Sequence, residues 1–404
     1  MNFREFELQE VLDVQWGDTK TTKSSYVPSG YMAYSASGPD GFLEKFDYEE
    51  DGVVLSAIGA NCGVTYFASG RWSCIKNTIR ILKRSDEIDL AYFYYMTKAP
   101  DFWEVRGSAQ PFISQTDIRE KTVRIPELSA QRYISSTLQS LDDAMLANAE
   151  MSRTLESIAQ TLFRSWFVDF DPVRAKMAGK KPVGMDDATG ALFPDSMENS
   201  ELGDIPAGWT VQPFDQIVTI LSGGTPKTSE PDYWDGSIPW FSFVDAPSDK
   251  DVYFSKTERT ITDLGLANSA ARLVRPGITI ISARGTVGRT VMTSVPSAFN
   301  QSCYGVEGML GDHFTFLSLR NLVGRLRNLA HGGVFDTITR ETFHALRVCV
   351  PSQPILGVLE ETVTPIFERV KGIKKENHTL SEIRDALLPR LISGELRVPE
   401  DLVA

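Results

Sequence analysis

The sequence is poor in the residues that build metal centres and disulfide frameworks, with four cysteines and four histidines among 404 residues. No two cysteines form a C-x-x-C pair and no histidine stands at ligand spacing from one, which argues against a zinc site and against a disulfide framework. All four histidines lie in the second half of the chain, which excludes a histidine-based site present in both halves. The cysteines, which we expect to be reduced thiols in or near the core, are Cys62, Cys74, Cys303 and Cys349.

Signatures of catalysis are missing as well. The chain has no G-x-x-x-x-G-K-[ST] phosphate loop, no H-E-x-x-H, and no Asn-Pro-Pro-aromatic or Asp-Pro-Pro-aromatic turn of amino-methyltransferases. Pro100-Asp101 is not followed by the Glu-x-Lys with which nucleases hold a metal. The glycine-rich "SARGTVG" lies between two strand signals, so a β-turn is favoured over a phosphate cradle. These absences favour a binding protein over an enzyme.

Long apolar runs are also lacking. No stretch approaches 18 uninterrupted apolar residues, and the opening "MNFREFELQEV" has no basic region followed by an apolar run, so we expect a cytoplasmic protein. The net charge of −12 does not point to nucleic acid, which usually requires a basic footprint. Net charge is a sum over the whole chain, however, and other subunits of an assembly can neutralise most phosphates.

What the sequence does contain is a repeat. "GSAQPFISQTDIREKTVRIPELSAQ" begins at Gly107, and 225 residues later "GGVFDTITRETFHALRVCVPSQPIL" begins at Gly332. Without a gap, Ile113 falls on Ile338, and the apolar positions keep the same offset through the helical stretches that follow. Two unrelated helices of ordinary spacing would explain the helical part but not the Gly, Ile and Pro before it. The sequence therefore predicts two copies of one unit.

Each copy combines a β-rich part with a long helix, which predicts an α+β fold. Residues 1–126 and 209–351 read as short β-branched or aromatic runs stopped by Gly, Ser, Asn and Asp. Residues 127–168 carry apolar positions at helical spacing without Pro or Gly, which predicts a long amphipathic helix. Residues 352–404 carry a similar stripe, and the two stripes suggest a coiled-coil pair. Between the copies, residues 169–208 are rich in Gly, Pro, Asp and Lys and read as an extended linker held at fixed points.

The second helix differs from the first in its composition. Gly357, Pro365, Gly372 and Pro389 interrupt its stripe, and we expect them to kink or shorten the helix, particularly near Pro365.

One segment carries a specific resemblance: "LSGGTPKTSEPDYWDGSIPWFSFVD", residues 221–245. Its Ser222–Pro226 run and the later Ile238-Pro239-Trp240 resemble the opening of a target recognition domain in the DNA-specificity subunit of Type I restriction-modification enzymes. The alternative is an ordinary Gly/Pro-rich loop packed by three aromatic residues. "LFRSWFVDFDPVRAK" from Leu162 and "IRDALLPRLISGEL" from Ile383 are similar to the conserved regions of that family, so the resemblance covers nearly the whole chain.

The resemblance implies two pseudo-repeated mixed α/β target recognition domains (1–126 and 209–351) separated by two long antiparallel coiled-coil helices, the central conserved helix (127–168) and the distal conserved helix and C-terminal tail (352–404). Each domain of such a subunit reads one half of a bipartite, asymmetric sequence in double-stranded DNA, and the helices set the spacer and dock the methyltransferase subunits. Family members carry no active site. S-adenosylmethionine, ATP and magnesium would belong to the methyltransferase and restriction/translocase partners.

The first domain departs from the family pattern, because "DVQWGDTKTTKSSYVPSGYMAYSASG" stands where the second shows Gly-Gly-Thr-Pro. Its site residues therefore follow from rough correspondence only. The sequence leaves two other functions open, a standalone DNA-modifying enzyme with degenerate motifs and a coiled-coil scaffold that does not touch DNA.

Candidate DNA-binding residues are chosen by chemistry and position. Arg, Lys, Asn and Gln read base edges, while Ser, Thr, Lys and backbone amides hold phosphates. In the second domain the candidates, in expected loops, are Thr225, Lys227, Thr228, Arg284, Arg289, Asn300, Gln301 and His331. In the first domain they are Lys20, Thr21, Lys23, Ser24, Asn61, Arg71, Lys76 and Gln110. The alternative for each is a solvated surface residue. Tyr233 and Trp240 read as packing aromatics, and Trp166 and Phe167 are the predicted partner-binding residues.

Overall fold

The computed structural model describes residues 2–245, 252–254, 256–285, 287–330 and 337–399. The chain forms two compact units. Unit 1 consists of Met1–Leu146 and His378–Ala404, and unit 2 consists of Ala147–Asn377. Each unit contains one part of α4 (Leu128–Phe167) and one part of α10 (Gln353–Ser393), the two long helices. Among the described residues, no helix combines the length and apolarity needed to cross a membrane.

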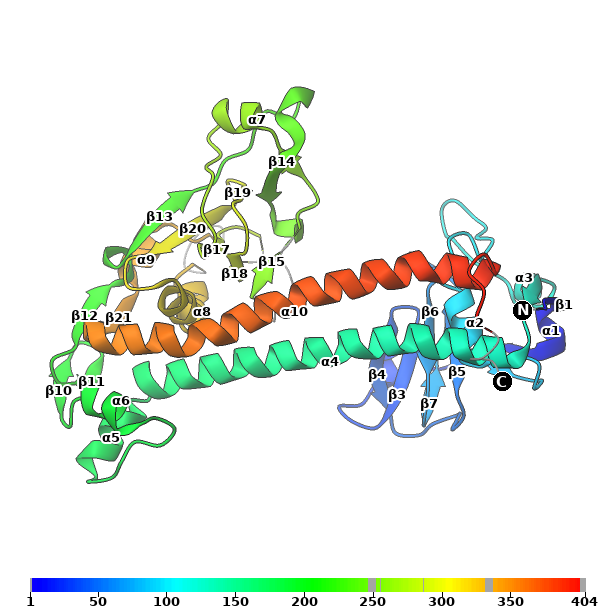
Figure 1. The fold of residues 1–404 in the computed structure, drawn as a ribbon, viewed down its shortest axis with the longest axis horizontal. Helices are drawn as coiled ribbons and strands as arrows, with labels where there is room; N and C mark the ends of the chain where they lie inside the picture. Colours follow the sequence, from blue (N-terminus) through cyan, green and yellow to red (C-terminus); the bar gives the residue numbers. More distant parts are fainter. Residues whose placement is uncertain (1, 246–251, 255, 286, 331–336, 400–404) are drawn as a thin grey trace. The chain divides into compact units, whose positions relative to one another are not determined.

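Unit 1 opens with short strands and helices (Figure 1). Its strands are β1 (Arg4–Glu7), β2 (Leu12–Trp16), β3 (Tyr31–Ser35), β4 (Gly38–Leu43), β5 (Gly52–Ser56), β6 (Thr65–Ala68), β7 (Trp72–Cys74), β8 (Thr78–Lys83) and β9 (Thr122–Ile125). Its shorter helices are α1 (Leu8–Val11), the 3-10 turn η1 (Lys23–Ser25), α2 (Leu90–Met96) and α3 (Gln115–Arg119). The main sheet has the antiparallel order β2-β8-β5-β6, beside a sheet β4-β3-β7 and a pair β1-β9. The central strand β5, "GVVLS", is buried along its whole length, as a β-branched run between two neighbouring strands should be.

Unit 2 also consists of short strands and short helices, and it has more of both than unit 1 among the described residues. Its strands are β10 (Met197–Ser200), β11 (Gly203–Pro206), β12 (Thr210–Pro213), β13 (Val218–Ser222), β14 (Trp234–Phe241), β15 (Tyr253–Phe254), β16 (Thr260–Ile261), β17 (Thr279–Ser282), β18 (Thr290–Thr293), β19 (Ala298–Phe299), β20 (Cys303–Gly308) and β21 (Arg347–Val350). Its shorter helices are α5 (Asp171–Met177), α6 (Asp187–Leu192), η2 (Phe214–Gln216), η3 (Pro231–Tyr233), η4 (Phe243–Asp245), α7 (Asp263–Ala267), α8 (Asp312–Ala330) and α9 (Arg340–Ala345). The main sheet has the order β13-β20-β17-β18-β15, beside a sheet β16-β14-β19 and the pairs β10-β11 and β12-β21.

The predicted duplication is confirmed in the topology of the two sheets. The order β2-β8-β5-β6 of unit 1 corresponds to β13-β20-β17-β18 of unit 2, and the closing pair β1-β9 corresponds to β12-β21. The repeated sequence also makes repeated contacts. Ile113 N donates to the Ala57 carbonyl at 2.9 Å, and Ile338 N donates to the Ala283 carbonyl at 3.0 Å. Ser114 and Thr339 then cap α3 and α9 in the same way.

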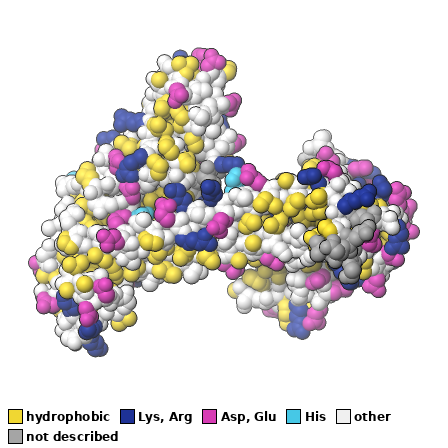
Figure 2. Space-filling view, in the orientation of Figure 1, with side chains coloured by type: hydrophobic (Ala, Val, Ile, Leu, Met, Phe, Trp, Pro, Cys, Tyr) yellow, Lys and Arg dark blue, Asp and Glu magenta, His cyan; other side chains and the backbone are white. Residues whose placement is uncertain are grey.

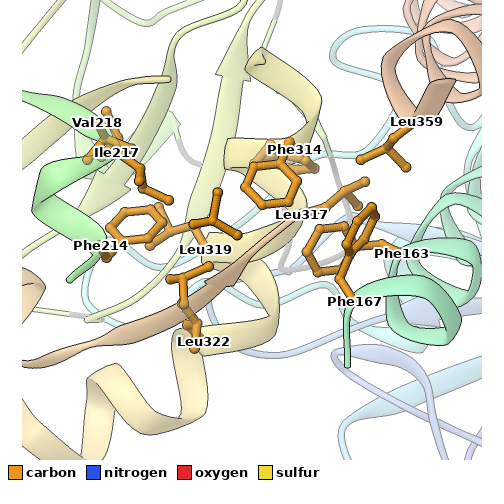
Figure 3. Close-up of a cluster of buried hydrophobic side chains, with 14 of the residues drawn as sticks. Phe163, Phe167, Phe214, Ile217, Val218, Phe314, Leu317, Leu319, Leu322 and Leu359 are labelled. Carbon is orange, nitrogen blue, oxygen red and sulfur yellow. The ribbon is translucent and has the colours of Figure 1, made fainter. Parts of the chain in front are cut away.

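The core of unit 2 is where the end of α4 and the start of α10 are buried. Phe163 and Phe167 of α4 point toward Phe314 and Leu317 of α8, next to Leu359 of α10 (Figure 3). All five side chains are buried. The apolar stripe of the first helix is therefore covered here by a helix of the recognition domain as well as by the second long helix.

The two long helices run antiparallel within each unit. In unit 1, Arg384 near the end of α10 donates to Asp142 of α4 at 2.8 Å. In unit 2, Asn148 of α4 donates to Asn377 of α10 at 2.9 Å, and the cores pair later α4 residues with earlier α10 residues. The antiparallel pairing that the resemblance implies is thus seen in the structure.

The expectation that Gly and Pro shorten the second helix is wrong. Helix α10 continues from Gln353 to Ser393 through Pro365 and Pro389. Proline in a helix interior costs about 3 kcal/mol, because one backbone hydrogen bond is lost and the ring crowds the preceding turn. Val363 and Phe367, on either side of Pro365, are fully buried in unit 2, and this packing outweighs the local cost.

The segment 169–208, which the sequence predicts to be an extended linker, contains α5, α6 and the hairpin β10-β11. It is fixed at points by buried apolar side chains. Phe193 packs edge-on against Trp166, with ring centroids 5.3 Å apart, and Ile205 lies in the same core.

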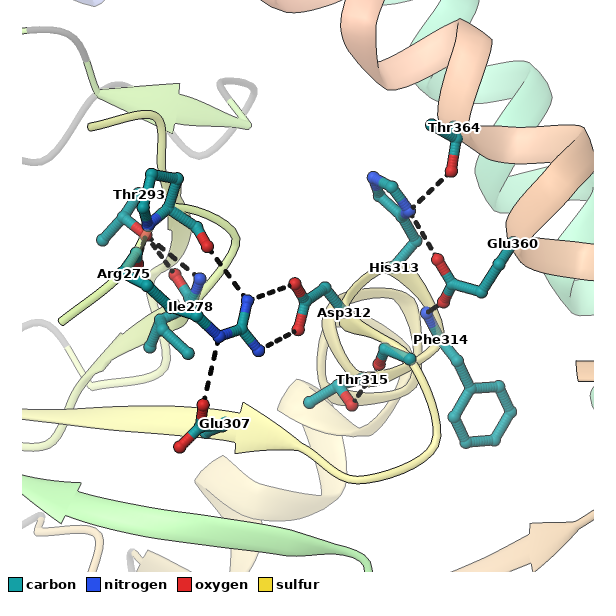
Figure 4. Close-up of polar contacts among 12 residues, drawn as sticks. Arg275, Ile278, Thr293, Glu307, Asp312, His313, Phe314, Thr315, Glu360 and Thr364 are labelled. Carbon is teal, nitrogen blue, oxygen red and sulfur yellow. Dashed lines mark hydrogen bonds and ion pairs between the residues drawn. The ribbon is translucent and has the colours of Figure 1, made fainter. Parts of the chain in front are cut away.

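Helix α8 is held at its start from two sides (Figure 4). Arg275 forms a two-pronged pair with Asp312, with N–O distances of 2.6 and 2.9 Å. On the other side, Glu360 of α10 accepts hydrogen bonds from His313, at 2.7 Å, and from the Phe314 backbone N–H, at 2.9 Å. The recognition part of unit 2 is thereby fastened to α10 by polar contacts as well as by its core.

Candidate nucleic-acid interface

In unit 1 the candidate DNA-binding residues gather at one edge of the main sheet. Neighbouring strands are antiparallel, so the end of β2, the start of β8, the end of β5 and the start of β6 all lie at the same edge. The loop after β2 carries four candidates, the turn before β8 carries one, and the turn between β5 and β6 carries one. These residues are Lys20, Thr21, Lys23, Ser24, Lys76 and Asn61.

Hydrogen bonds tie these loops together. The Lys76 N–H donates to the Thr21 carbonyl at 3.3 Å. Lys23 Nζ donates to the hydroxyl of Ser37 at 3.2 Å, and Asn61 Nδ2 donates to the neighbouring Ala36 carbonyl at 3.1 Å. Both therefore reach the turn between β3 and β4, so candidates far apart in sequence share one surface.

The remaining two candidates of the first domain, Gln110 and Arg71, lie at different places. Gln110 joins the edge, because its loop bonds to the turn after β5 through Gly59 N and the Pro111 carbonyl, at 3.0 Å. Arg71 does not join it. It lies in the turn between β6 and β7, at the other end of β6, and pairs with Glu49 at 2.7 Å. The rough correspondence with the second domain therefore did not bring it to this edge.

Unit 2 places its candidates at the corresponding edge. Ser222 ends β13 opposite Tyr304 of β20, and Ser282 ends β17 opposite Cys303, so three loops meet there. The Thr225 hydroxyl donates to the side chain of Gln301, and the Ala283 N–H donates to the Ser302 carbonyl at 2.8 Å. The candidates at this edge are Thr225, Lys227, Thr228, Arg284, Arg289, Asn300 and Gln301. His331 lies outside the described residues.

The Gly-Gly-Thr-Pro signature builds this edge by close packing. A Cβ on Gly223 would overlap the Asn300 carbonyl, and one on Gly224 would overlap the backbone of Ala270. Trp240 donates from Nε1 to the Gly224 carbonyl at 2.9 Å, and Trp240 is buried, as the sequence predicts for this packing aromatic. The glycines are therefore explained by contact with neighbouring backbone, and the loop they shape presents Thr225 and Lys227.

Several candidate cations lie beside carboxylates. Hydrogen bonds from the Thr21 hydroxyl and the Lys20 backbone lower the pKa of Asp18, so this carboxylate stays charged next to Lys20. Burial raises the pKa of Asp40, but hydrogen bonds from Lys23, among others, outweigh it, and the pKa is lowered overall. Figure 2 shows the same mixture, with Lys and Arg interspersed among Asp and Glu on the face drawn.

The predicted partner-binding residues Trp166 and Phe167 lie inside unit 2. Their exposed fractions are 3% and 6%, and both pack against aromatic side chains. Substitution would first disturb the core of this unit, and contact with a partner stays a prediction.

Sequence reasoning missed one arginine at the second edge. Arg259, which is exposed, lies over the ring of Trp234 with its guanidinium carbon 3.4 Å from the ring centroid. The Trp234 Nε1 in turn donates to the Lys227 carbonyl at 3.1 Å, so Arg259 stands beside the signature loop. No motif or spacing connects these residues in the sequence, because the contact depends on the pairing of β14 with β16.

In the part of the chain that the structure describes, no group of three or more His, Cys, Asp or Glu side chains is placed to hold a metal ion. All four cysteines are free thiols, as predicted, and burial raises the pKa of Cys303 to about 12.

Comparison with known proteins agrees with this architecture. Residues 1–156 and 206–378 match the model of the Type I restriction modification DNA specificity domain. The chain is 29% identical over 336 residues to the Type I restriction enzyme HindI specificity subunit of Haemophilus influenzae, covering 72% of this chain and 73% of that protein. It is 26% identical over 361 residues to the MjaIX specificity subunit of Methanocaldococcus jannaschii, covering 86% of this chain and 78% of that protein.

Among solved structures, the S subunit of a Type I restriction-modification system from M. genitalium shares the fold, with a TM-score of 0.60, 16% identity and 96% of both chains covered. The two family matches coincide with the two repeated sheets, each with its edge of polar loops. The chain belongs to the Type I restriction-modification DNA specificity family.

Proposed function

We propose that this chain is the sequence-reading subunit of a Type I restriction-modification complex, and that each unit reads one half of a bipartite, asymmetric DNA site. The observation that carries the proposal is the correspondence of the two sheet edges, because both present Lys, Asn, Gln and Thr side chains from loops fixed by equivalent strands. Two similar but non-identical readers are what an asymmetric, split sequence requires.

The loops suit readout of bases because rigid elements hold them. Specificity depends on hydrogen bonds from side chains to base edges, and such side chains need fixed positions. Strands β5 and β17 are buried along their whole lengths, so the turns that follow them start from an immobile sheet. Arg284 after β17 and Lys76 before β8 are the exposed cations best placed for this role.

We assign the chemistry to other subunits. The chain would carry no catalytic activity of its own, and methyltransferase subunits docked on the helices would supply S-adenosylmethionine chemistry. Restriction and translocation subunits would supply the steps that need ATP and magnesium. The relatives support this division by name, because the HindI and MjaIX proteins are specificity subunits of Type I restriction enzymes.

The decisive experiment combines the purified chain with its methyltransferase subunit, S-adenosylmethionine and a library of duplex DNA, and maps the methylated adenines. We expect one bipartite motif. The variant Lys76→Ala should relax or weaken one half of the motif and Arg284→Ala the other, each by roughly 1–3 kcal/mol if the side chain reads a base.

A matched control is Arg84→Ala, which removes an exposed arginine that follows β8 at the opposite edge of the first sheet. It should leave both half-sequences unchanged. Methylation or cleavage of DNA by the chain alone would overturn the non-catalytic assignment. A single undivided motif, or one whose two halves both change with Arg284→Ala, would overturn the assignment of one reader to each half.

A further inference from the structure

An arginine in unit 2 is stacked flat on an indole beside the signature loop. The guanidinium carbon of Arg259 lies 3.4 Å from the centroid of the Trp234 ring, which is close van der Waals contact. A guanidinium tilted at this distance would push one of its nitrogens into the ring, so the two planes lie parallel. The five N–H groups of the arginine therefore point along the surface of the ring and not into it.

The stack fixes the guanidinium without occupying its donors. Arg259 is exposed, and among the described residues its N–H groups make no hydrogen bond or ion pair. Arg275 of the same unit is the opposite case, because its guanidinium is bound by Asp312 and Glu307. Arg259 is thus an oriented cation whose hydrogen bonds are available to a ligand.

The indole beneath the arginine is held in one position. Trp234 is 6% exposed, donates from Nε1 to the Lys227 carbonyl at 3.1 Å and meets Trp240 edge-on, with ring centroids 5.2 Å apart. Trp240 in turn donates to the Gly224 carbonyl at 2.9 Å. The two indoles are therefore bonded at two points to the loop that carries the candidates Thr225 and Lys227.

A bulge in β14 gives Trp234 this place. Trp234 and Ile238 both face Ile261 of β16, so the residues between them leave the ladder. Asp235 has a φ of +58°, and a Cβ on Gly236 would overlap the Ile261 carbonyl. Residues other than glycine adopt positive φ infrequently, and bulges and strained residues are concentrated near functional sites, where they aim a side chain.

An oriented guanidinium with available donors selects a ligand that has two adjacent acceptors in one plane. In the major groove only guanine presents such an edge, through O6 and N7. Adenine offers N7 beside an amino donor, thymine offers one carbonyl, and cytosine offers an amino donor. A phosphate also has two acceptor oxygens, but contacts to phosphate carry no sequence information and do not require a side chain fixed in one direction. The fixed direction of Arg259 therefore favours a base edge.

We propose that Arg259 reads a guanine in the half-site recognised by unit 2, donating two parallel hydrogen bonds from its guanidinium to O6 and N7. The inference rests on the proposed function and deepens it, because it assigns one base to one residue. Trp234 is a positioning residue, since it contacts the arginine and holds the guanidinium in the plane that the base edge must share.

The first test maps the methylated motif of the full chain in complex with its methyltransferase subunit. We expect a guanine, on either strand, in the half-site that changes when residues 209–351 are exchanged for those of another family member. Arg259→Gln and Arg259→Met should accept other bases at that position, with selectivity for guanine lowered roughly 5- to 150-fold and the other positions unchanged. Methionine covers the indole without supplying donors, so this variant separates base reading from packing.

The second test removes an acceptor from the DNA. Replacement of that guanine by 7-deazaguanine, which lacks the N7 acceptor, should weaken binding to the wild-type complex roughly tenfold, as expected for loss of one charged hydrogen bond. It should not weaken binding to the Arg259→Gln complex. Arg325→Gln is the matched control, because this exposed arginine lines a cavity that contains no residue of β14 or β16, and it should respond as the wild type does.

Three results would overturn the assignment while leaving the proposed function intact. The first is unchanged selectivity in the folded Arg259→Met variant. The second is a wild-type half-site that contains no guanine, or in which 7-deazaguanine is tolerated at every guanine. The third is an equal loss of affinity for all sequences with a smaller salt slope, which would indicate a phosphate contact. A wild-type motif that is not bipartite would instead refute the proposed function.

Discussion

Replacing Trp166 by Ala tests the physical role of the aromatic cluster at the end of α4. The indole is 3% exposed and packs edge-on against Phe193, with ring centroids 5.3 Å apart. The ring centroid of its neighbour Phe167 lies 5.6 Å from that of Phe314 in α8 and 5.8 Å from that of Trp209. The cluster therefore joins α4, α8 and the segment after α4. Removal of the indole leaves a cavity that these elements can only partly close.

The expected loss follows from burial. Truncation of a buried Trp or Phe to Ala costs about 3–5 kcal/mol in unfolding free energy. For a unit of this size, each kcal/mol lowers the melting temperature by about 2–4 °C, so we expect a decrease of roughly 10 °C in the transition of unit 2. The double variant Trp166→Ala/Phe167→Ala should lose less than the sum of the single variants, because the two rings touch.

Differential scanning calorimetry and urea unfolding measure this effect. Ile158→Ala is the matched control, since Ile158 lies on the same helix but is 50% exposed and should cost less than about 1 kcal/mol. A loss below 1 kcal/mol for Trp166→Ala would refute the structural role argued here. Affinity for the methyltransferase subunit, measured well below the melting temperature, tests the separate prediction of partner binding. Unchanged affinity in the folded double variant would contradict it.

Three further predictions address modularity, spacing and pH. Exchange of residues 209–351 for those of another family member should change one half of the methylated motif, because Thr210 pairs with Val350 and the ends of the segment are adjacent; a change in both halves would contradict it. Insertion of four helix-forming residues after Leu146, matched by four after Asn377, should lengthen the spacer between the half-sites by one or two base pairs, since four residues add about 6 Å of helix. If mapping of the methylated adenines shows an active variant with an unchanged spacer, the helices do not set the spacer length. Burial lowers the pKa of Lys98 to about 8, so the unfolded chain binds its proton more tightly and stability from this group should rise between about pH 8 and the unfolded value of 10.5. The unfolding free energy of the wild type relative to that of Lys98→Met should therefore increase between pH 7 and 9.5, by less than about 2 kcal/mol because solvent screens this exposed side chain. Parallel pH profiles for the two proteins would refute it.

The features predicted well from the sequence are those written in local patterns. The constant, gap-free spacing between the two copies of the repeat predicted the duplication, and Ile113 and Ile338 occupy equivalent places in the two cores. Strand runs stopped by polar residues located the loops, and antiparallel pairing then brought candidates such as Lys76 and Asn61 to one edge. Arg71 lies at the other end of β6, because rough correspondence with the second domain does not say at which end of a strand a turn lies.

Other features depend on contacts between segments far apart in the chain. The propensity of Pro365 to end a helix is a local property, whereas the burial of Val363 and Phe367 that overrides it is tertiary. The stacking of Arg259 on Trp234 likewise requires the pairing of β14 with β16. No window of sequence contains either arrangement.

The acidity of the chain shapes how it can bind DNA. At the edge of unit 1, Asp18 and Asp40 partly neutralise the charges of Lys20 and Lys23, and the ion pair with Asp40 also fixes the position of the Lys23 ammonium. Such cations contribute little to long-range attraction but can discriminate bases at close range, where geometry decides the interaction. Affinity must then come from elsewhere, from partner subunits that neutralise phosphates. Because salt weakens phosphate contacts far more than base contacts, variants of the sheet edge that lose a base contact should change which sequence is methylated more than they change the salt dependence of binding.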